Sequence, residues 1–332
     1  MNGNEIKIDV VLDLAYGDCG KGKVTHALSR KNIYTHVIRF SGGGNAGHTI
    51  YHNGIKFVTH LIPSGVFNGV KSIIGPGCVV NPTKLHHEIN YLTEAGIKDV
   101  DSLVKVAKNA HIVTMDHVME ESEEKEIGTT KTGNGPAYRD KYMRKGIRAE
   151  AVSNFISTID MHEEFYDGKD KIILAEGAQG FYLDPDWGHY PYVTSSHCGI
   201  GSVLLNGFNH KQIRKVYGVI KAYETYVGAK KFEGDDPVFP KIRQLGHEYG
   251  ATTGRSRQVN WINFNELIQA INMNGIDELL VNKIDILREL NVWKTRNSSG
   301  VVKEYQNETD FRKAIQDALS IPVVFSDNPH EI

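Results

Sequence analysis

The sequence predicts an α/β fold with a mainly parallel central sheet. Short runs rich in Val and Ile recur along the 332 residues, and longer polar or amphipathic stretches separate them. Strands buried on both faces read as such short apolar runs. Alternation of strand-like and helix-like segments is typical of parallel α/β proteins, in which each crossover is a helix.

Seven segments have the composition of buried strands, and strands are expected at 8–14, 36–40, 72–74, 172–175, 216–222, 278–281 and 321–325. Amphipathic helices are expected at 84–95, 264–274 and 310–319, and another helix is expected to begin near Val24. The acidic run 120–126 is expected to be a solvated helix face or a loop. No repeat or linker divides the chain, so residues 1–332 are expected to form one large domain.

Composition limits the classes of function. A net charge of −2 with mixed acidic and basic residues argues against a nucleic-acid-binding groove. The three cysteines, Cys19, Cys78 and Cys198, are too scattered for a disulfide framework or a zinc cluster, which favours a reducing compartment. No signal or bilayer-spanning segment is recognisable, so a cytoplasmic protein with no membrane partner is expected, in the host cytoplasm if the source is viral.

A glycine-rich segment, GDCGKGK, follows the first expected strand. Glycines let backbone amides approach an anion, and lysines at a helix N-terminus neutralise phosphate oxygens. The spacing nearly matches a P-loop, but Val24 stands where the magnesium-binding hydroxyl belongs. Asp18 is unusual in a phosphate cradle, because a carboxylate there must bind a cation or move a proton. A tight turn with a solvated aspartate is an equally good interpretation of the segment alone.

A second loop, SGGGNAGHT at 41–49, also follows a strand end, where α/β enzymes bind ligands. Asn45 and His48 could orient or protonate a phosphate there, although a lone histidine is more often structural. Three later segments also follow expected strands or contain side chains that can bind a ligand. Gln179 in EGAQG could pair with a lactam edge, and GATTGRSR at 250–257 combines hydroxyls with two arginines suited to carboxylates. The segment NKID at 282–285 resembles the base-reading signature of guanine-nucleotide proteins.

Taken together and in order, these segments resemble the adenylosuccinate synthetase family. The family's WGDEGKGK is similar to YGDCGKGK at 16–23, and its GGHNAGHT to GGGNAGHT at 42–49. HLIPSG at 60–65, EGAQG at 176–180, YPYVTSS at 190–196 and GATTGR at 250–255 are intact. IGTTKTGNGPAY at 127–138 and NKID at 282–285 are close variants, so the resemblance extends from about residue 10 to residue 287.

The resemblance implies a single adenylosuccinate synthetase-like domain with a P-loop-like phosphate site, acting as a purine nucleotide ligase. A nucleoside triphosphate phosphorylates the 6-oxygen of a purine nucleoside monophosphate, and L-aspartate then displaces the phosphate. It implies that Asp18 is the general base, that His48 is the general acid and that Gln179 contacts the 6-oxygen. Mg²⁺ would be bound by Asp18 and Gly47. A homodimer is implied, in which Arg144 reaches the neighbouring subunit's site.

The remaining implied contacts fall into three groups. The donor nucleotide would meet Gly17, Gly20, Lys21, Gly22, Lys23, Lys283, Asp285 and Ser326. The purine nucleotide would meet Asn45, Thr130, Arg144, Gln179, Thr194, Val227 and Arg255. The carboxylates of aspartate would meet Thr252, Thr253, Arg255 and Arg257.

Three departures from the family pattern bear on the substrates. Cys19 replaces a glutamate beside the expected base, VGAGPFPTE becomes VGAKKFEG at 227–234, and the C-terminal STGP becomes SDNP at 326–329. A short branch found in phages resembles the family but acts on dGMP, on the way to 2-aminoadenine DNA. These changes favour dGMP as the substrate, with IMP as the alternative. Lys283 and Asp285 suggest GTP as the donor, whereas the altered C-terminal segment suggests ATP or dATP. A nucleotide-binding regulator without catalysis is the alternative from another class.

Overall fold

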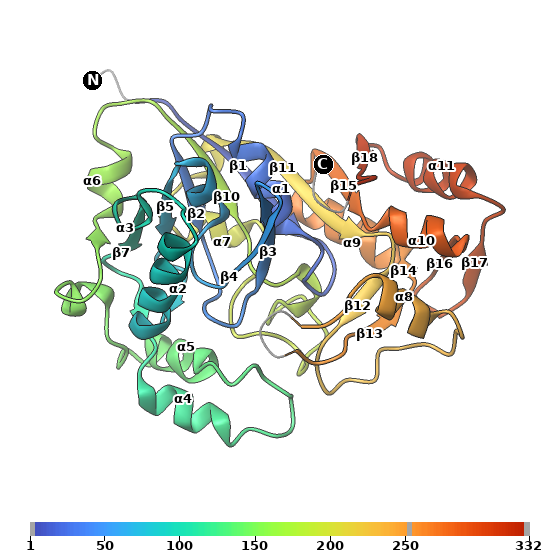
Figure 1. Ribbon diagram of the computed structural model, residues 1–332, viewed down its shortest axis with the longest axis horizontal. Coiled ribbons are helices and arrows are strands. Elements are labelled where there is room, and N and C mark those ends of the chain that lie inside the picture. Colours follow the sequence, from blue (N-terminus) through green and yellow to red (C-terminus); the bar gives the residue numbers. More distant parts are fainter. Residues whose placement is uncertain (1–3, 251–253, 329–332) are drawn as a thin grey trace.

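The computed structural model describes residues 4–250 and 254–328. The strands of the central sheet are β1 Ile6–Asp13, β2 His36–Arg39, β5 Lys71–Ile74, β7 Val104–Ala107, β9 Thr158–Ile159, β10 Lys171–Glu176, β11 Ile213–Lys221, β15 Glu278–Asn282 and β18 Val323–Phe325. Their order is β18-β15-β11-β1-β10-β2-β5-β7-β9 (Figure 1), and each neighbouring pair is parallel. The predicted fold class is therefore confirmed.

Smaller ladders surround this sheet. They are formed by β3 His48–His52 with β4 Ile55–Thr59, β6 Val79–Val80 with β8 His111–Ile112, β12 Glu224–Tyr226 with β13 Gln258–Asn260, and β14 Ile262–Asn263 with β16 Lys294–Arg296 and β17 Val302–Glu304. The α-helices are α1 Lys21–Ser29, α2 Pro82–Glu94, α3 Val100–Leu103, α4 Met115–Ser122, α5 Asn134–Tyr142, α6 Met161–Phe165, α7 Gly201–Leu204, α8 Phe239–Leu245, α9 Phe264–Asn274, α10 Ile284–Leu290 and α11 Glu308–Ala318. Figure 1 shows α2 and α3 near β5 and β7 at one end of the molecule, and α10 and α11 near β15 and β18 at the other.

The seven expected strands all belong to the central sheet, and the expected helices correspond to α2, α9 and α11. Two predictions need correction. The helix expected near Val24 begins earlier, at Lys21, because Gly20 takes a left-handed conformation (φ 99°) and starts the first turn itself. The acidic run 120–126 is divided between the last turn of α4 and a following turn, so it is neither a whole helix face nor a whole loop.

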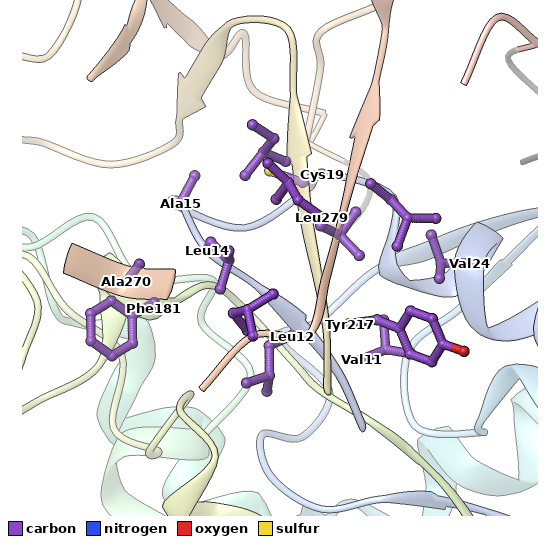
Figure 2. Close-up of a cluster of buried hydrophobic side chains, with 14 of the residues drawn as sticks. Val11, Leu12, Leu14, Ala15, Cys19, Val24, Phe181, Tyr217, Ala270 and Leu279 are labelled. Atoms are coloured by element: carbon purple, nitrogen blue, oxygen red, sulfur yellow. The ribbon is translucent and has the colours of Figure 1, made fainter. Parts of the chain in front are cut away.

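The core fills the space between the sheet and its helices. Val11 and Leu12 of β1, Tyr217 of β11 and Leu279 of β15 are buried in one hydrophobic cluster, which Figure 2 shows together with Phe181. Residues on both faces of β1 are buried, as a parallel strand covered by helices on both sides requires. The sheet is thereby held as a rigid base for the loops at its carboxyl edge.

Parallel topology brings the glycine-rich segments together. The carboxyl ends of β1, β10 and β2 lead into loops 14–20, 177–180 and 40–47, and β15 and β18 lead into Lys283 and Ser326. Since the carboxyl ends of parallel strands meet at one edge of a sheet, segments more than 300 residues apart in sequence lie along the same edge. Among the described residues, none of the helices combines the length and apolar character needed to span a lipid bilayer.

Candidate functional site

The glycine-rich loop after β1 is organised by Asp13, which is buried at the end of the strand. Its Oδ1 accepts hydrogen bonds from the backbone amides of Ala15 (3.0 Å) and Gly17 (3.2 Å), and its Oδ2 accepts one from the amide of Cys19 (3.0 Å). A carboxylate that accepts several amides holds a tight turn in one shape. Asp13 was not among the expected site residues; an acidic residue closing an apolar strand was the available signal.

Lys21 completes this arrangement at the first turn of α1. Its Nζ donates to Asp13 Oδ2 (3.1 Å) and to the main-chain oxygen of Gln179, and the side chain is 3% exposed. In this structure Lys21 therefore ties the loop to the segment after β10. The helix also packs tightly on β3, because a Cβ at Gly22 would lie only 2.7 Å from His48 Cβ.

Asp18 lies at the top of the same loop in a left-handed conformation (φ 59°). Its side chain is 30% exposed, and its Oδ2 is 2.9 Å from NH2 of Arg257. Asp18 is thus accessible and paired with one of the two arginines that the resemblance assigns to aspartate. Thr252 and Thr253, also assigned to aspartate, lie outside the described residues.

His48 belongs to a buried cluster of charged groups. Its Nδ1 bonds Oε1 of Glu176, and Ser64 donates to the same carboxylate from its amide (2.7 Å) and its hydroxyl (2.8 Å). NH2 of Arg39 lies 3.3 Å from His48 Nδ1 and 3.9 Å from Glu176 Oε1. Because an ionised carboxylate only accepts, the proton lies on Nδ1. The other ring nitrogen, Nε2, is buried and has no hydrogen-bond partner in the described part of the chain.

The electrostatics of this cluster favour a neutral imidazole beside an ionised carboxylate. Burial, reinforced by the positive charge of Arg39, lowers the pKa of His48 to about 4. Burial opposes ionisation of Glu176, but His48, Arg39 and the Ser64 amide outweigh it and lower its pKa to about 2. Glu176, Arg39 and Ser64 were not predicted individually, although two of them lie in the segments EGAQG and HLIPSG.

Three expected purine contacts meet in a chain of hydrogen bonds. Gln179 Nε2 donates to Asn45 Oδ1 (3.0 Å), and Asn45 Nδ2 donates to Thr194 Oγ1 (3.4 Å). Ser196 Oγ donates to the remaining amide oxygen of Gln179 (3.4 Å). Polar groups from the loops after β2 and β10 and from the segment 190–196 therefore converge, and three of them are residues that the resemblance assigns to the purine nucleotide.

Other expected purine contacts are placed differently. Arg255 donates to the carbonyls of Gly128 (2.9 Å) and Thr129 (3.4 Å), which brings it to the segment of Thr130. Thr130 Oγ1 lies 3.0 Å from Thr132 Oγ1. Val227 is half-buried just after β12. Arg144 follows α5 in a left-handed conformation (φ 63°), and its side chain is exposed.

Several residues expected to contact the donor nucleotide lie near Lys23 of α1. Lys23 Nζ donates to Ser326 Oγ (2.7 Å) and to the Asn328 carbonyl (2.8 Å). Lys283 Nζ donates to the carbonyl of Gly246 (3.0 Å). Burial lowers the pKa of Lys23 to about 8, with Asp285 opposing and Lys283 reinforcing the effect. Asp285 is half-buried in the first turn of α10, next to this group.

The structure changes the interpretation of Cys19. Its side chain is 2% exposed, its Sγ lies 3.4 Å from the Gly17 carbonyl, and Figure 2 shows it within the hydrophobic cluster. Burial raises the pKa of its thiol well above the ordinary range. Cys19 therefore faces the core, and its replacement of a glutamate gives no support from this structure for a change in the purine site.

One edge of the parallel sheet carries a glycine-rich loop suited to phosphate, a carboxylate and a buried imidazole. This combination defines a nucleotide-dependent enzyme. The family model described as adenylosuccinate synthetase matches residues 10–165 and 155–306, and the chain belongs to this family of carbon–nitrogen ligases. The chain is 37% identical over 340 residues to adenylosuccinate synthetase of Thermoplasma volcanium, covering 86% of this chain and 77% of that protein. It is 39% identical over 341 residues to that of Lactococcus lactis, covering 86% and 78%.

Two solved structures share the fold. Fully ligated adenylosuccinate synthetase from Plasmodium falciparum has a TM-score of 0.86 and 28% identity, covering 97% of this chain and 98% of that one. Succinoaminodeoxyadenylate synthetase of cyanophage S-2L, bound to dGMP and dATP, has a TM-score of 0.76 and 21% identity, covering 98% and 94%.

Proposed function

We propose that the protein joins L-aspartate to C6 of a 6-oxopurine nucleoside monophosphate, in two steps driven by a nucleoside triphosphate. The observation that carries this proposal is the packing of the loop that holds Asp18. A Cβ at Gly17 would lie 3.5 Å from the Gln179 backbone, and one at Gly22 would lie 2.7 Å from His48. The loop of Asp18, the segment of Gln179 and the start of α1 beside His48 therefore pack together, as proton removal and phosphoryl transfer at one purine edge require.

In the first step, Asp18 accepts the proton from purine N1, and negative charge moves to O6. O6 forms a bond to the γ-phosphorus, and the bond between that phosphorus and its bridging oxygen breaks, so a nucleoside diphosphate leaves. His48 would act as the general acid toward the transferring phosphate through Nε2. Its Nδ1–H remains hydrogen-bonded to Glu176, and this bond fixes the orientation of the ring. Because the resting imidazole carries one proton, on Nδ1, this acid role requires His48 to gain a second proton when phosphates bind nearby.

In the second step, the amine of L-aspartate attacks C6 and the phosphate on O6 leaves. Arg255 and Arg257, with Thr252 and Thr253, would hold the two carboxylates, and Gln179 would contact the 6-position. Lys21, Lys23 and the amides of Gly17, Gly20 and Gly22 would hold the donor phosphates. Asn45, Thr130 and Thr194 would hold the monophosphate, and Val227 would lie beside the ribose.

The expected metal site has a donor set suited to magnesium. Asp18 offers a partly exposed carboxylate, and Gly47, half-buried before β3, offers its carbonyl. Such oxygen ligands are those that Mg²⁺ prefers, with water and phosphate oxygens completing the shell. When bound, Mg²⁺ would neutralise negative charge on the donor phosphates.

IMP is the substrate that the comparisons favour. The relatives from Thermoplasma volcanium and Lactococcus lactis are named adenylosuccinate synthetases and are 37% and 39% identical, whereas the dGMP-bound cyanophage protein is 21% identical. The burial of Cys19 also removes one reason for preferring dGMP.

dGMP is the second candidate, and the altered segment 227–234 favours it. Gln258 closes this segment by accepting from the amides of Phe232 (2.8 Å) and Glu233 (3.1 Å) and by donating to the Lys230 carbonyl (2.7 Å). Lys230 Nζ also lies 5.7 Å from the centre of the Tyr16 ring. A lysine on the expected ribose side gives the pocket a shape and charge that the family pattern lacks.

For the phosphate donor we propose GTP, with ATP or dATP second. An aspartate carboxylate can accept from both N–H groups on the guanine edge, and Asp285 is half-buried beside Lys283 and Lys23. The alternative is favoured by the C-terminal segment, where Ser326 and the Asn328 carbonyl bind Lys23 in place of the family's STGP contacts.

The experiment is a grid of substrate pairs. The purified protein is incubated with L-aspartate, Mg²⁺, and IMP or dGMP, each with GTP, ATP or dATP, and phosphate and the succino-nucleotide are measured. We expect kcat/KM for IMP with GTP to exceed that of every other pair. If dGMP were turned over and IMP were not, dGMP would replace IMP as the proposed substrate. Absence of phosphate release with every pair would contradict the ligase proposal and favour a nucleotide-binding regulator.

We further propose a homodimer in which Arg144 contacts the monophosphate bound to the partner subunit, since its exposed position after α5 leaves it available. Mixing inactive Asp18→Asn and Arg144→Ala chains tests this arrangement. Mixed dimers should regain activity in the one site that has both residues, and no recovery would contradict a shared site. A cytoplasmic location stays a prediction, with which the three buried free cysteines are consistent.

A further inference from the structure

Four charged side chains form a continuous row that runs from the sheet to the site. Lys221, at the end of β11, lies 3.0 Å from Oε2 of Glu248. The same oxygen accepts from NH1 of Arg257 (2.5 Å), and NH2 of Arg257 lies 2.9 Å from Asp18. Charges alternate along the row, so its net charge is zero. The row joins the rigid sheet to the expected general base.

Glu248 is the fixed point of this row. It is completely buried, and its second oxygen, Oε1, accepts from the hydroxyl of Tyr223 (2.6 Å). Lys221 is itself held by Thr225, whose hydroxyl lies 2.5 Å from Nζ. Burial opposes ionisation of Glu248, but Lys221 and Arg257 outweigh it and lower its pKa to about 2. The carboxylate of Glu248 is therefore charged. Lys221 of β11 contacts one of its oxygens and Tyr223, just after β11, contacts the other.

The guanidinium of Arg257 keeps two N–H groups for a ligand, the one on Nε and the second one on NH2. NH1 is used by Glu248 and NH2 by Asp18, while Nε is buried and has no hydrogen-bond partner among residues 4–250 and 254–328. Nε and NH2 lie on the same side of a guanidinium, and that edge fits both oxygens of a carboxylate. Without the contact between NH1 and Glu248, the guanidinium could rotate, and this edge would no longer be held in one orientation.

We propose that Glu248 is a positioning residue for the bond-forming reaction. By holding NH1, it fixes the guanidinium of Arg257 so that NH2 reaches Asp18, while Nε and the second hydrogen of NH2 can receive a carboxylate of L-aspartate. The proposal rests on the proposed function, because it takes Arg257 as an aspartate contact. Glu248 itself touches no substrate; it acts through Arg257.

The first test is Glu248→Gln, assayed by initial rates with each substrate varied in turn. Loss of a charged, two-point contact costs about 1.5–3 kcal/mol, so we expect the KM for L-aspartate to rise about tenfold to a hundredfold. The KM values for the purine nucleotide and the triphosphate should change less than about twofold, because neither is bound by Arg257. A loss confined to protein stability would lower the active fraction without this selective change in KM.

Glu248→Gln leaves Lys221 buried without its counter-charge, which costs enough to threaten folding. The double variant Lys221→Met with Glu248→Leu removes both charges and keeps the volume, so it retains a neutral row while releasing NH1. It should show the same selective rise in the KM for aspartate. A folded double variant with an unchanged KM for aspartate would overturn the proposal.

Asp9 offers a matched control. It is a buried carboxylate on β1 that accepts from Arg214 (2.8 and 2.6 Å) and from the hydroxyl of Tyr34 (2.6 Å), near the opposite edge of the sheet. Asp9→Asn should lower stability as Glu248→Gln does but leave the KM for aspartate unchanged. An equal rise in both variants would show that the effect is general destabilisation and would overturn the proposal. Absence of wild-type turnover with every substrate pair would instead refute the proposed function.

Discussion

Asp18 combines an unusual backbone conformation with an exposed carboxylate. Its φ of 59° belongs to the left-handed region, which non-glycine residues adopt at a cost, so the loop must hold it there. Asp13 does so by accepting from the amides on either side of it in the sequence, Gly17 and Cys19. The strained turn therefore directs Asp18 out of the loop toward Arg257.

Replacing Asp18 by asparagine tests its role as general base. The amide keeps the size of the side chain but cannot accept the N1 proton, so we expect kcat to fall by about 10³-fold. The Kd for the purine nucleotide, measured by calorimetry, should change only a few-fold. Retention of wild-type turnover in this variant would contradict the mechanism.

Glu176→Gln tests the tautomer of His48. Ser64 donates to both oxygens of Glu176, so a glutamine must turn an N–H toward one of these donors or toward His48 Nδ1. The latter moves the imidazole proton to Nε2, and in either case His48 loses the carboxylate that stabilises the doubly protonated ring on which its acid role depends. We expect kcat to fall about 10²-fold or more with little change in the KM for aspartate, measured by steady-state kinetics. An unchanged kcat would show that Glu176 has only a structural role.

The sequence predicted Asp18, His48, Gln179 and Asn45 through motif resemblance. It did not predict Asp13 and Arg39, because their roles depend on burial and on partners distant in the chain. Supporting residues of this kind have no local pattern, since an acidic residue closing a strand is equally compatible with an exposed turn.

At the scale of elements, the contact between α1 and β3 determines where His48 lies. Gly22→Ala would place a Cβ 2.7 Å from His48 Cβ, closer than side chains pack, so α1 or β3 must shift. We expect kcat/KM to fall about tenfold or more even if the protein folds, because displacements near 1 Å are costly in active sites. Gly201→Ala is the matched control, since no atom lies within 4 Å of the added Cβ. Equal activity of the two variants would contradict a positioning contact.

The strands from β18 to β5 in the order of the sheet were predicted, whereas β7 and β9 at its other end were not. β9 has two residues and β7 has four, directly after the short helix α3. Segments this short carry little periodic signal. They become strands through pairing with their neighbours in the sheet. The start of α1 was displaced by three residues, because a glycine in a left-handed conformation begins the helix where apolar periodicity has not yet appeared.

For the molecule as a whole, strand order could not be obtained from the pattern of strands. Sequence neighbours β2 and β1 are separated by β10 in the sheet, which is what places Glu176 between the loops that carry His48 and Asp18. Hydrophobic periodicity identifies strands but not their neighbours, so this order was not predicted.

Stability should fall as the pH is lowered from 7.5 to 5.5. Burial lowers the pKa of His26 and of His48 to about 4, compared with about 6.5 in an unfolded chain. Between these values the unfolded chain binds protons that the native state does not, so acid favours unfolding. The lowered pKa values of Glu176 and Glu248 act only below about 4.5, outside this range.

His26→Asn should reduce the fall in Tm between pH 7.5 and 5.5, measured by differential scanning fluorimetry. His162→Asn, at an exposed position in α6, is the control and should behave like wild type. If His26→Asn showed the full decrease in Tm, protonation of His26 would not contribute to it.

The central claim is that the purine 6-oxygen attacks phosphorus and leaves as phosphate. Turnover of IMP labelled with ¹⁸O at position 6, with aspartate, Mg²⁺ and GTP, tests it directly by mass spectrometry of the released phosphate. The mechanism predicts one ¹⁸O in each phosphate formed per succino-nucleotide. Unlabelled phosphate, with the label released into water, would contradict it.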